Sequence, residues 1–141
     1  MKRFIKQSES IMAMALINPQ LSKQLTIQAE IKQGGEGPIP HIHVYHDKTK
    51  KVCSYIRLDK PEYSEHHRRG KKLPAALKAE FIQLMNDMWA GYIIKSPTGF
   101  RPATGYESAV YIWADTYENG SLDKFNRDSN GELIVPDYSL L

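Results

Sequence analysis

The chain has 141 residues, of which 41% are apolar and 25% charged, and this predicts one globular domain over 1–141. Its single cysteine excludes an intramolecular disulfide, and no apolar run reaches the roughly 18 residues that a transmembrane helix needs. We therefore expect a cytoplasmic protein with no membrane segment and no signal peptide.

The first half of the chain predicts one short helix and three strands. Residues 8–17 have weak helical spacing, and Asn18-Pro19 would end this N-terminal helix. Apolar and polar residues alternate over 25–32, 41–46 and 52–58, a period of two that predicts half-buried strands. Because the connections between these segments are short, we expect a three-stranded antiparallel meander.

Two further helices should complete an α+β fold. An apolar stripe from Leu77 to Tyr92 predicts an amphipathic helix over 74–93. Residues 104–107 read Thr-Gly-Tyr-Glu, the form of a capping box, which predicts a second helix over 105–118. We interpret 96–103 as the loop between them, and we expect the sheet to pack on these helices.

Charge is spread unevenly along the chain. Residues 46–72 carry nine Lys/Arg and four Asp/Glu, a local charge of +5, whereas residues 102–141 carry two Lys/Arg and seven Asp/Glu, a local charge of −5. The basic segment would attract phosphates and the acidic one would repel them. The competing interpretation is two solvated faces, or an acidic segment that folds against the basic loop.

All five histidines lie between His41 and His67, in the same window as the only cysteine, Cys53. Imidazoles titrate near neutral pH and bind metals, so this clustering indicates a candidate site. Side chains two apart on a strand point the same way, about 6.5–7 Å from one another. We expect the sheet face turned away from the helices to be the solvent side and to carry these candidate binding residues: His41, His43, Tyr45, Tyr55 and Arg57.

A metal site is one interpretation of the histidines. His41 and His43 could chelate zinc or a similar divalent ion if His66 or His67 supplied a third ligand. No HExxH, CxxC or carboxylate-rich spacing is present, and Tyr45 stands where a histidine-triad hydrolase needs its third histidine. We therefore expect no cofactor, an ordinary strand thiol at Cys53, and a polar sheet face on which His and Tyr pair across strands.

The stretch over 66–72 is the best candidate for binding an anion. The arginine guanidinium binds phosphate through two parallel hydrogen bonds. A helix N-terminus, which also favours anions, is expected directly after this stretch. Together with Tyr45, Tyr55 and Tyr63 it could hold RNA or single-stranded DNA, although a solvated loop is the competing interpretation. The candidate binding residues are His66, His67, Arg68, Arg69, Lys71 and Lys72.

The string Pro40-His41-Ile42-His43-Val44, followed by a strand and by a helix that ends near Trp89, resembles the DUF4160 family of small prokaryotic proteins. The resemblance covers roughly residues 26–95, and only His41 and His43 carry over as signature positions. This chain departs from the family in its size, in the long loop 59–72 and in the C-terminal helix. The family has no established activity, and the resemblance implies an accessory protein of a phage or mobile element.

We therefore expect a small accessory or binding protein that engages nucleic acid or a protein partner through the basic 46–72 segment and the His/Arg-rich sheet face. Because no complete catalytic motif is present, an enzyme is the less favoured interpretation. The enzyme alternative is a metal-dependent phosphodiesterase or nuclease with His41 and His43 as ligands. The third alternative is a structural or assembly protein in which the polar face forms an oligomer contact.

Overall fold

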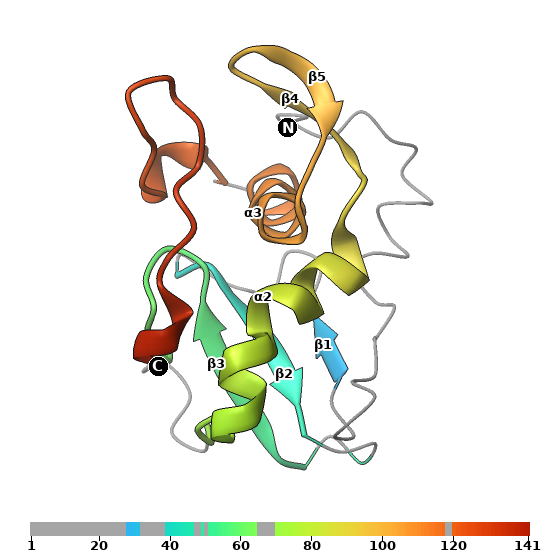
Figure 1. Ribbon diagram of the computed structural model, residues 1–141, viewed down its shortest axis with the longest axis vertical. Coiled ribbons are helices and arrows are strands. Elements are labelled where there is room, and N and C mark those ends of the chain that lie inside the picture. Colours follow the sequence, from blue (N-terminus) through green and yellow to red (C-terminus); the bar gives the residue numbers. More distant parts are fainter. Residues whose placement is uncertain (1–27, 32–38, 47–48, 50, 65–69, 118–119) are drawn as a thin grey trace.

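The computed structural model describes residues 28–31, 39–46, 49, 51–64, 70–117 and 120–141. These residues form α-helices and antiparallel sheets, so the predicted α+β class is confirmed (Figure 1). The predicted helix over 8–17 and the outer ends of the predicted strand over 25–32 lie outside the described residues. No helix in the described part of the chain is long and apolar enough to cross a membrane.

A sheet with the order β1-β2-β3 lies at one end of the molecule; its strands are β1 (Gln28–Glu30), β2 (His41–Tyr45) and β3 (Cys53–Arg57). Both pairings are antiparallel, with Ile42 opposite Ile56 and Val44 opposite Ser54. Successive side chains alternate between the two faces of a strand. Ile42, Val44 and Ile56 therefore share one face, and all are fully buried in the apolar core.

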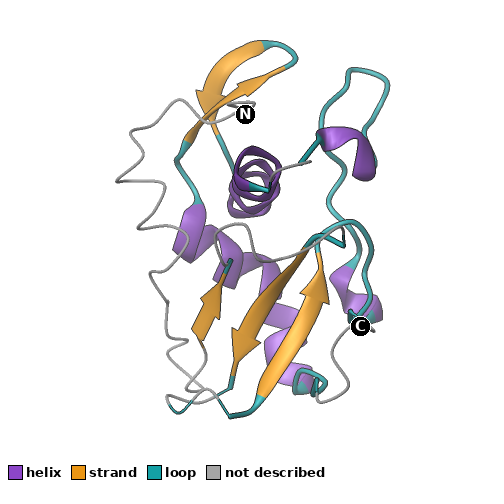
Figure 2. Ribbon diagram, turned by 180° about the vertical axis from the view of Figure 1, so that it is seen from behind, coloured by secondary structure: helices purple, strands orange, loops and turns teal. Residues whose placement is uncertain are grey.

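Helix α2 (Ala75–Trp89) crosses that apolar face of the sheet, and Figure 2 shows the sheet from the other side with α2 behind it. Its buried residues follow the predicted stripe: Leu77, Phe81, Leu84, Met85 and Trp89. The helix ends four residues before the predicted boundary at 93. Ala90 is extended and Gly91 has a φ of 94°, a conformation that glycine adopts without a Cβ clash.

The predicted loop over 96–103 is wrong, because the chain forms a hairpin of β4 (Ile93–Ser96) and β5 (Gly99–Pro102). The apolar run at 92–94 fits a helical stripe and a strand equally well. A turn at 97–98, followed by Gly99 at a φ of 122°, reverses the chain and lets the two short strands pair.

Helix α3 (Gly105–Thr116) lies between α2 and the β4–β5 hairpin (Figure 1). The predicted capping box is confirmed: Thr104 Oγ1 accepts from the Glu107 N–H at 3.2 Å, and Glu107 Oε1 accepts from the Thr104 N–H at 2.9 Å. Every residue from Gly105 to Asp115 is buried. The helix is therefore covered on all sides and not only along one stripe.

After α3 the chain forms two 3₁₀ turns, η1 (Leu122–Lys124) and η2 (Tyr138–Leu140). The second turn returns to the sheet, where the Tyr138 hydroxyl donates to the Arg57 carbonyl at 2.7 Å. The Tyr138 ring lies 4.8 Å from the Phe81 ring in an edge-to-face contact. The end of the described chain is thus part of the core around α2.

Candidate functional site

The expected solvent-side location of the two histidines of β2 is wrong. His41 is 2% exposed and His43 is 8% exposed, and every residue of β2 is buried. The alternation itself is as expected, because Ile42 and Val44 occupy the apolar core on the helix side. The alternation of apolar and polar residues predicts which side of the strand a residue occupies. It does not predict whether other parts of the chain cover that side.

The buried histidines form an aromatic cluster with the tyrosines of the same face. The rings of His41 and His43 stack at 5.2 Å with an interplanar angle of 16°, and Tyr55 meets His43 edge-on at 4.8 Å. His41 Nδ1 donates to the Ile39 carbonyl at 2.9 Å, and His43 Nδ1 lies 3.3 Å from the Tyr45 hydroxyl. The predicted pairing of His and Tyr across strands is therefore present, in a buried setting.

The described part of this cluster contains two of the ligands that the metal interpretation requires, His41 and His43. Among the described residues no group of three or more His, Cys, Asp or Glu side chains is arranged to hold one. The candidate third ligands His66 and His67 lie outside the described residues, as do Arg68 and Arg69. The Cys53 thiol is buried and lies 3.5 Å from the Ser54 carbonyl.

Arg57, the cation predicted for the same face, is held by an ion pair. Its Nε and Nη2 donate to the two carboxylate oxygens of Asp59 at 2.8 and 2.7 Å. This bidentate contact uses the same guanidinium N–H groups that could otherwise form bidentate hydrogen bonds with a phosphate. The sheet face therefore gathers the predicted residues His41, His43, Tyr45, Tyr55 and Arg57, and hydrogen bonds join His41 to Ile39, His43 to Tyr45 and Arg57 to Asp59.

The outer edge of β3 is covered by later parts of the basic segment. Tyr63 forms an antiparallel bridge with Ile56, and the Ser64 N–H donates to the Tyr55 carbonyl at 2.7 Å. Further along the same edge, the Lys71 N–H donates to the Cys53 carbonyl at 2.8 Å. Residues 70–73 thus return to the sheet beside the first residue of β3.

Two side chains fix this returning segment in place. The Ser54 hydroxyl donates to the Lys71 carbonyl at 2.5 Å, and the Leu73 N–H donates to the Tyr63 hydroxyl oxygen at 2.8 Å. His46 Nε2 lies 2.7 Å from Ser54 Oγ. Because the single Ser54 proton is used on Lys71, His46 must be the donor in this contact.

The result is a cluster of exposed lysines at the start of β3, consisting of Lys51, Lys71 and Lys72 and called the lysine cluster below. All three are exposed, and none forms an ion pair within the described ranges. The stretches 51–58 and 70–79 contain no Asp or Glu. The cluster adjoins the first turn of α2, which has no acidic residue and no side-chain cap at Pro74.

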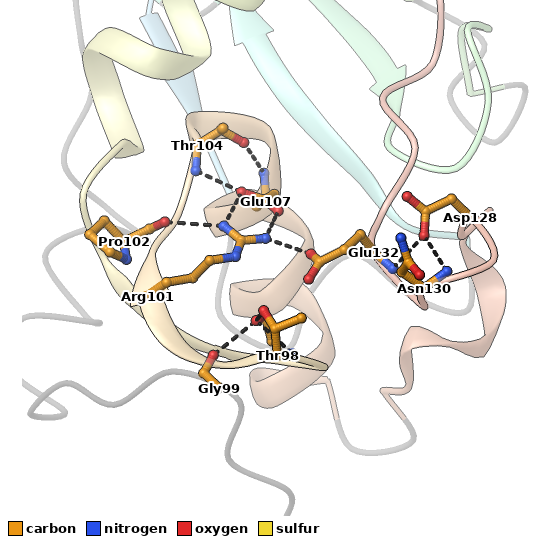
Figure 3. Close-up of polar contacts among 10 residues, drawn as sticks. Thr98, Gly99, Arg101, Pro102, Thr104, Glu107, Asp128, Asn130 and Glu132 are labelled. Atoms are coloured by element: carbon orange, nitrogen blue, oxygen red, sulfur yellow. Dashed lines mark hydrogen bonds and ion pairs between the residues drawn. The ribbon is translucent and has the colours of Figure 1, made fainter.

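The acidic segment does not neutralise these lysines in the part of the chain that is described. Glu107 and Glu132 pair with Arg101 (Figure 3), and Asp123 pairs with Arg127. The first turn of α2 lies at one end of the long axis of the molecule, whereas η1 and the loop after it lie toward the other end (Figure 1). The first turn of α2, which the lysine cluster adjoins, and the loop after η1 therefore lie in different parts of the molecule.

Sequence analysis missed Ser54 and Tyr63 as residues that shape the site. One signal was present: the alternation over 52–58 places a serine between Val52 and Ile56 on the core face, where a polar side chain needs a partner. That partner, the Lys71 carbonyl, lies 17 residues away in the sequence. Tyr63 was expected only as an aromatic residue beside nucleic acid, and the sequence offered no signal for its hydrogen bond to the Leu73 N–H.

No family model matches the chain, and no curated protein and no solved structure matches it. The resemblance to the DUF4160 family stays a prediction that rests on residues 40–44. Function must therefore be inferred from the residues and contacts described above.

Proposed function

We propose that this chain is a small binding protein that engages single-stranded nucleic acid through the lysine cluster. The observation that carries this proposal is the grouping of three exposed ammonium groups, Lys51, Lys71 and Lys72, with no ion-pair partner among the described residues. Uncompensated charge on a protein surface attracts an oppositely charged partner and raises its association rate. The burial of His41 and His43 moves the proposed contact from the sheet face to the sheet edge.

The backbone of a nucleic acid has the chemistry that suits this cluster. Each ammonium group that contacts a phosphate releases condensed counterions, so the affinity should fall steeply with salt. The first turn of α2 has no side-chain cap, and it adds the positive end of the helix dipole beside Lys72. A flexible single strand can follow such a compact group of charges without needing a groove.

Binding of a short fluorescent oligothymidylate, followed by anisotropy over a range of salt concentrations, tests the proposal. We expect the variant Lys71→Ala/Lys72→Ala to bind more weakly and to lose about 1.4 from the slope of log K against log salt, since each single-strand phosphate contact contributes roughly 0.7. Because both side chains are exposed, stability should change by less than about 0.5 kcal/mol per substitution.

The matched control removes two exposed lysines that lie outside the cluster, Lys95 on β4 and Lys124 in η1. The control variant Lys95→Ala/Lys124→Ala has the same net charge as the test variant, and we expect it to keep the wild-type salt slope. Wild-type protein that does not bind the probe, or binds it independently of salt, would contradict the proposal and favour a protein partner.

A metal-dependent phosphodiesterase or nuclease is the second candidate, and the hydrogen bond of His41 supports it. A metal-binding histidine commonly donates through one ring nitrogen to an oxygen, as His41 does to the Ile39 carbonyl. Metal analysis of the purified protein separates the two candidates. We expect no stoichiometric zinc; zinc that is retained by the wild type and lost in both His41→Ala and His43→Ala would favour hydrolysis.

A further inference from the structure

Residues 70–73 carry two of the three lysines of the lysine cluster on a segment that is neither helix nor strand. The segment contains Lys71 and Lys72 and lies between the start of α2 and residues outside the described ranges. Within the described residues, three individual hydrogen bonds hold it, from Lys71 N–H to the Cys53 carbonyl, from Ser54 Oγ to the Lys71 carbonyl and from Leu73 N–H to Tyr63 Oη.

Of these three bonds, two depend on side chains and can be removed by substitution. Ser54 is fully buried and Tyr63 is partly buried, so neither is placed to touch a partner at the surface as the lysines are. Ser54 bonds to the backbone of Lys71, and Tyr63 bonds to the backbone of the residue after Lys72. Between them they fix the positions from which both lysine side chains project.

We infer that Ser54 and Tyr63 form a clamp that positions Lys71 and Lys72 for the anionic partner. The inference rests on the proposed function and adds to it two positioning residues that act only through the lysines. A lysine that projects from a fixed backbone loses less conformational entropy on binding than one on a loose segment, so the clamp should raise affinity. It should do so without any contact between the clamp and the nucleic acid.

The oligothymidylate assay tests this inference in two backgrounds. In the wild-type background we expect Ser54→Ala and Tyr63→Phe each to raise Kd by about three- to tenfold, the range that corresponds to one lost hydrogen bond. In the Lys71→Ala/Lys72→Ala background the same changes should alter Kd by less than about twofold, because no lysine is left to position. A role in general stability would lower affinity equally in both backgrounds.

Ser96 provides a matched control in the β4–β5 hairpin. It is also buried, its hydroxyl donates to the Gly99 carbonyl at 2.9 Å, and it accepts from the Thr98 N–H at 3.2 Å. Ser96→Ala should leave Kd unchanged. Hydrogen exchange supplies a readout that does not depend on binding: the amide of Lys71 should exchange faster in Ser54→Ala than in wild type, and that of Leu73 faster in Tyr63→Phe.

The outcomes separate this inference from the proposed function. Wild-type binding that Ser54→Ala and Tyr63→Phe leave unchanged overturns the clamp alone, as does an equal loss of affinity in both lysine backgrounds. A wild-type protein that does not bind the probe overturns the proposed function and the clamp with it. If Ser54→Ala fails to fold, Tyr63→Phe decides the question, because Tyr63 is only partly buried and phenylalanine keeps its packing.

Discussion

Arg101 shows how single charged residues hold distant parts of this chain together. Its guanidinium donates to both carboxylate oxygens of Glu107, at 3.0 and 2.5 Å, and to Glu132 at 2.6 Å (Figure 3). It thereby joins β5, the first turn of α3 and the C-terminal segment. Burial raises the pKa of Glu107, whereas the hydrogen bonds from Arg101 and Thr104 lower it. The lowering is the larger effect, so the pKa of Glu107 lies below its ordinary value.

We predict that Arg101→Ala lowers the free energy of unfolding by about 1–3 kcal/mol at neutral pH, because it leaves the buried Glu107 carboxylate with fewer partners. The unfolded chain binds a proton to Glu107 at higher pH than the folded chain does. The stabilisation by this contact is therefore present above the ordinary pKa of about 4.5 and is lost as the pH falls through the folded pKa. The difference in the free energy of unfolding between Arg101→Ala and wild type should therefore shrink as the pH falls.

Denaturant unfolding at several pH values measures this difference. Arg127 supplies the control, because its ion pair with Asp123 is exposed, with 39% and 84% of the two side chains accessible. Arg127→Ala should cost less than about 1 kcal/mol at every pH. A loss of similar size in the two variants would contradict a special contribution from Arg101.

At the scale of elements, the packing of α3 on α2 depends on the absence of one side chain. A Cβ on Gly105 would lie 2.0 Å from the Met85 carbonyl oxygen, and the Gly105 N–H donates to Asn86 Oδ1 at 2.8 Å. The first turn of α3 thus contacts the backbone near the end of α2 directly. Only glycine permits so close an approach.

We therefore predict that Gly105→Ala lowers the free energy of unfolding by about 1–3 kcal/mol or more, because the two helices must move apart. Gly91 is the control, since its φ is 94° but a Cβ at this position would meet no atom within 4 Å. Gly91→Ala should cost only the backbone strain, about 1–2 kcal/mol. Thermal unfolding of both variants shows which substitution costs more stability. A smaller loss of stability in Gly105→Ala than in Gly91→Ala would contradict the packing argument.

At the scale of the whole molecule, the last residues close the core. Tyr138 is 3% exposed, contacts Phe81 and donates to the Arg57 carbonyl. Burial raises the pKa of the Tyr138 hydroxyl well above its ordinary value, which keeps it protonated as a donor. The contact joins residues that lie 81 positions apart in the sequence.

We predict that Tyr138→Ala lowers the free energy of unfolding by about 3–5 kcal/mol, the range for removing a large buried aromatic side chain. Leu140, which is 70% exposed in the same 3₁₀ turn, is the control, and Leu140→Ala should change stability by less than about 0.5 kcal/mol. Circular dichroism during denaturant unfolding measures both. Equal effects would mean that the turn does not pack on the core.

The sequence by itself determined the elements that depend on neighbouring residues. The capping box at Thr104 and Glu107 involves residues three apart, and the buried face of α2 repeats within each turn, so a local pattern predicts both. The alternation along β2 also predicted correctly that Ile42 and Val44 face the core. These features need no knowledge of the rest of the chain.

Only the tertiary structure decided what covers each surface. His41 and His43 occupy the predicted face and are nevertheless buried. Residues 93–102 form a hairpin that was not predicted, because the apolar run at 92–94 fits the period of a helix as well as that of a strand. Lys71 lies at the start of β3 through bonds to Cys53 and Ser54. Such contacts join residues far apart in sequence, and because any polar residue can be solvated or paired, its type alone does not select the partner.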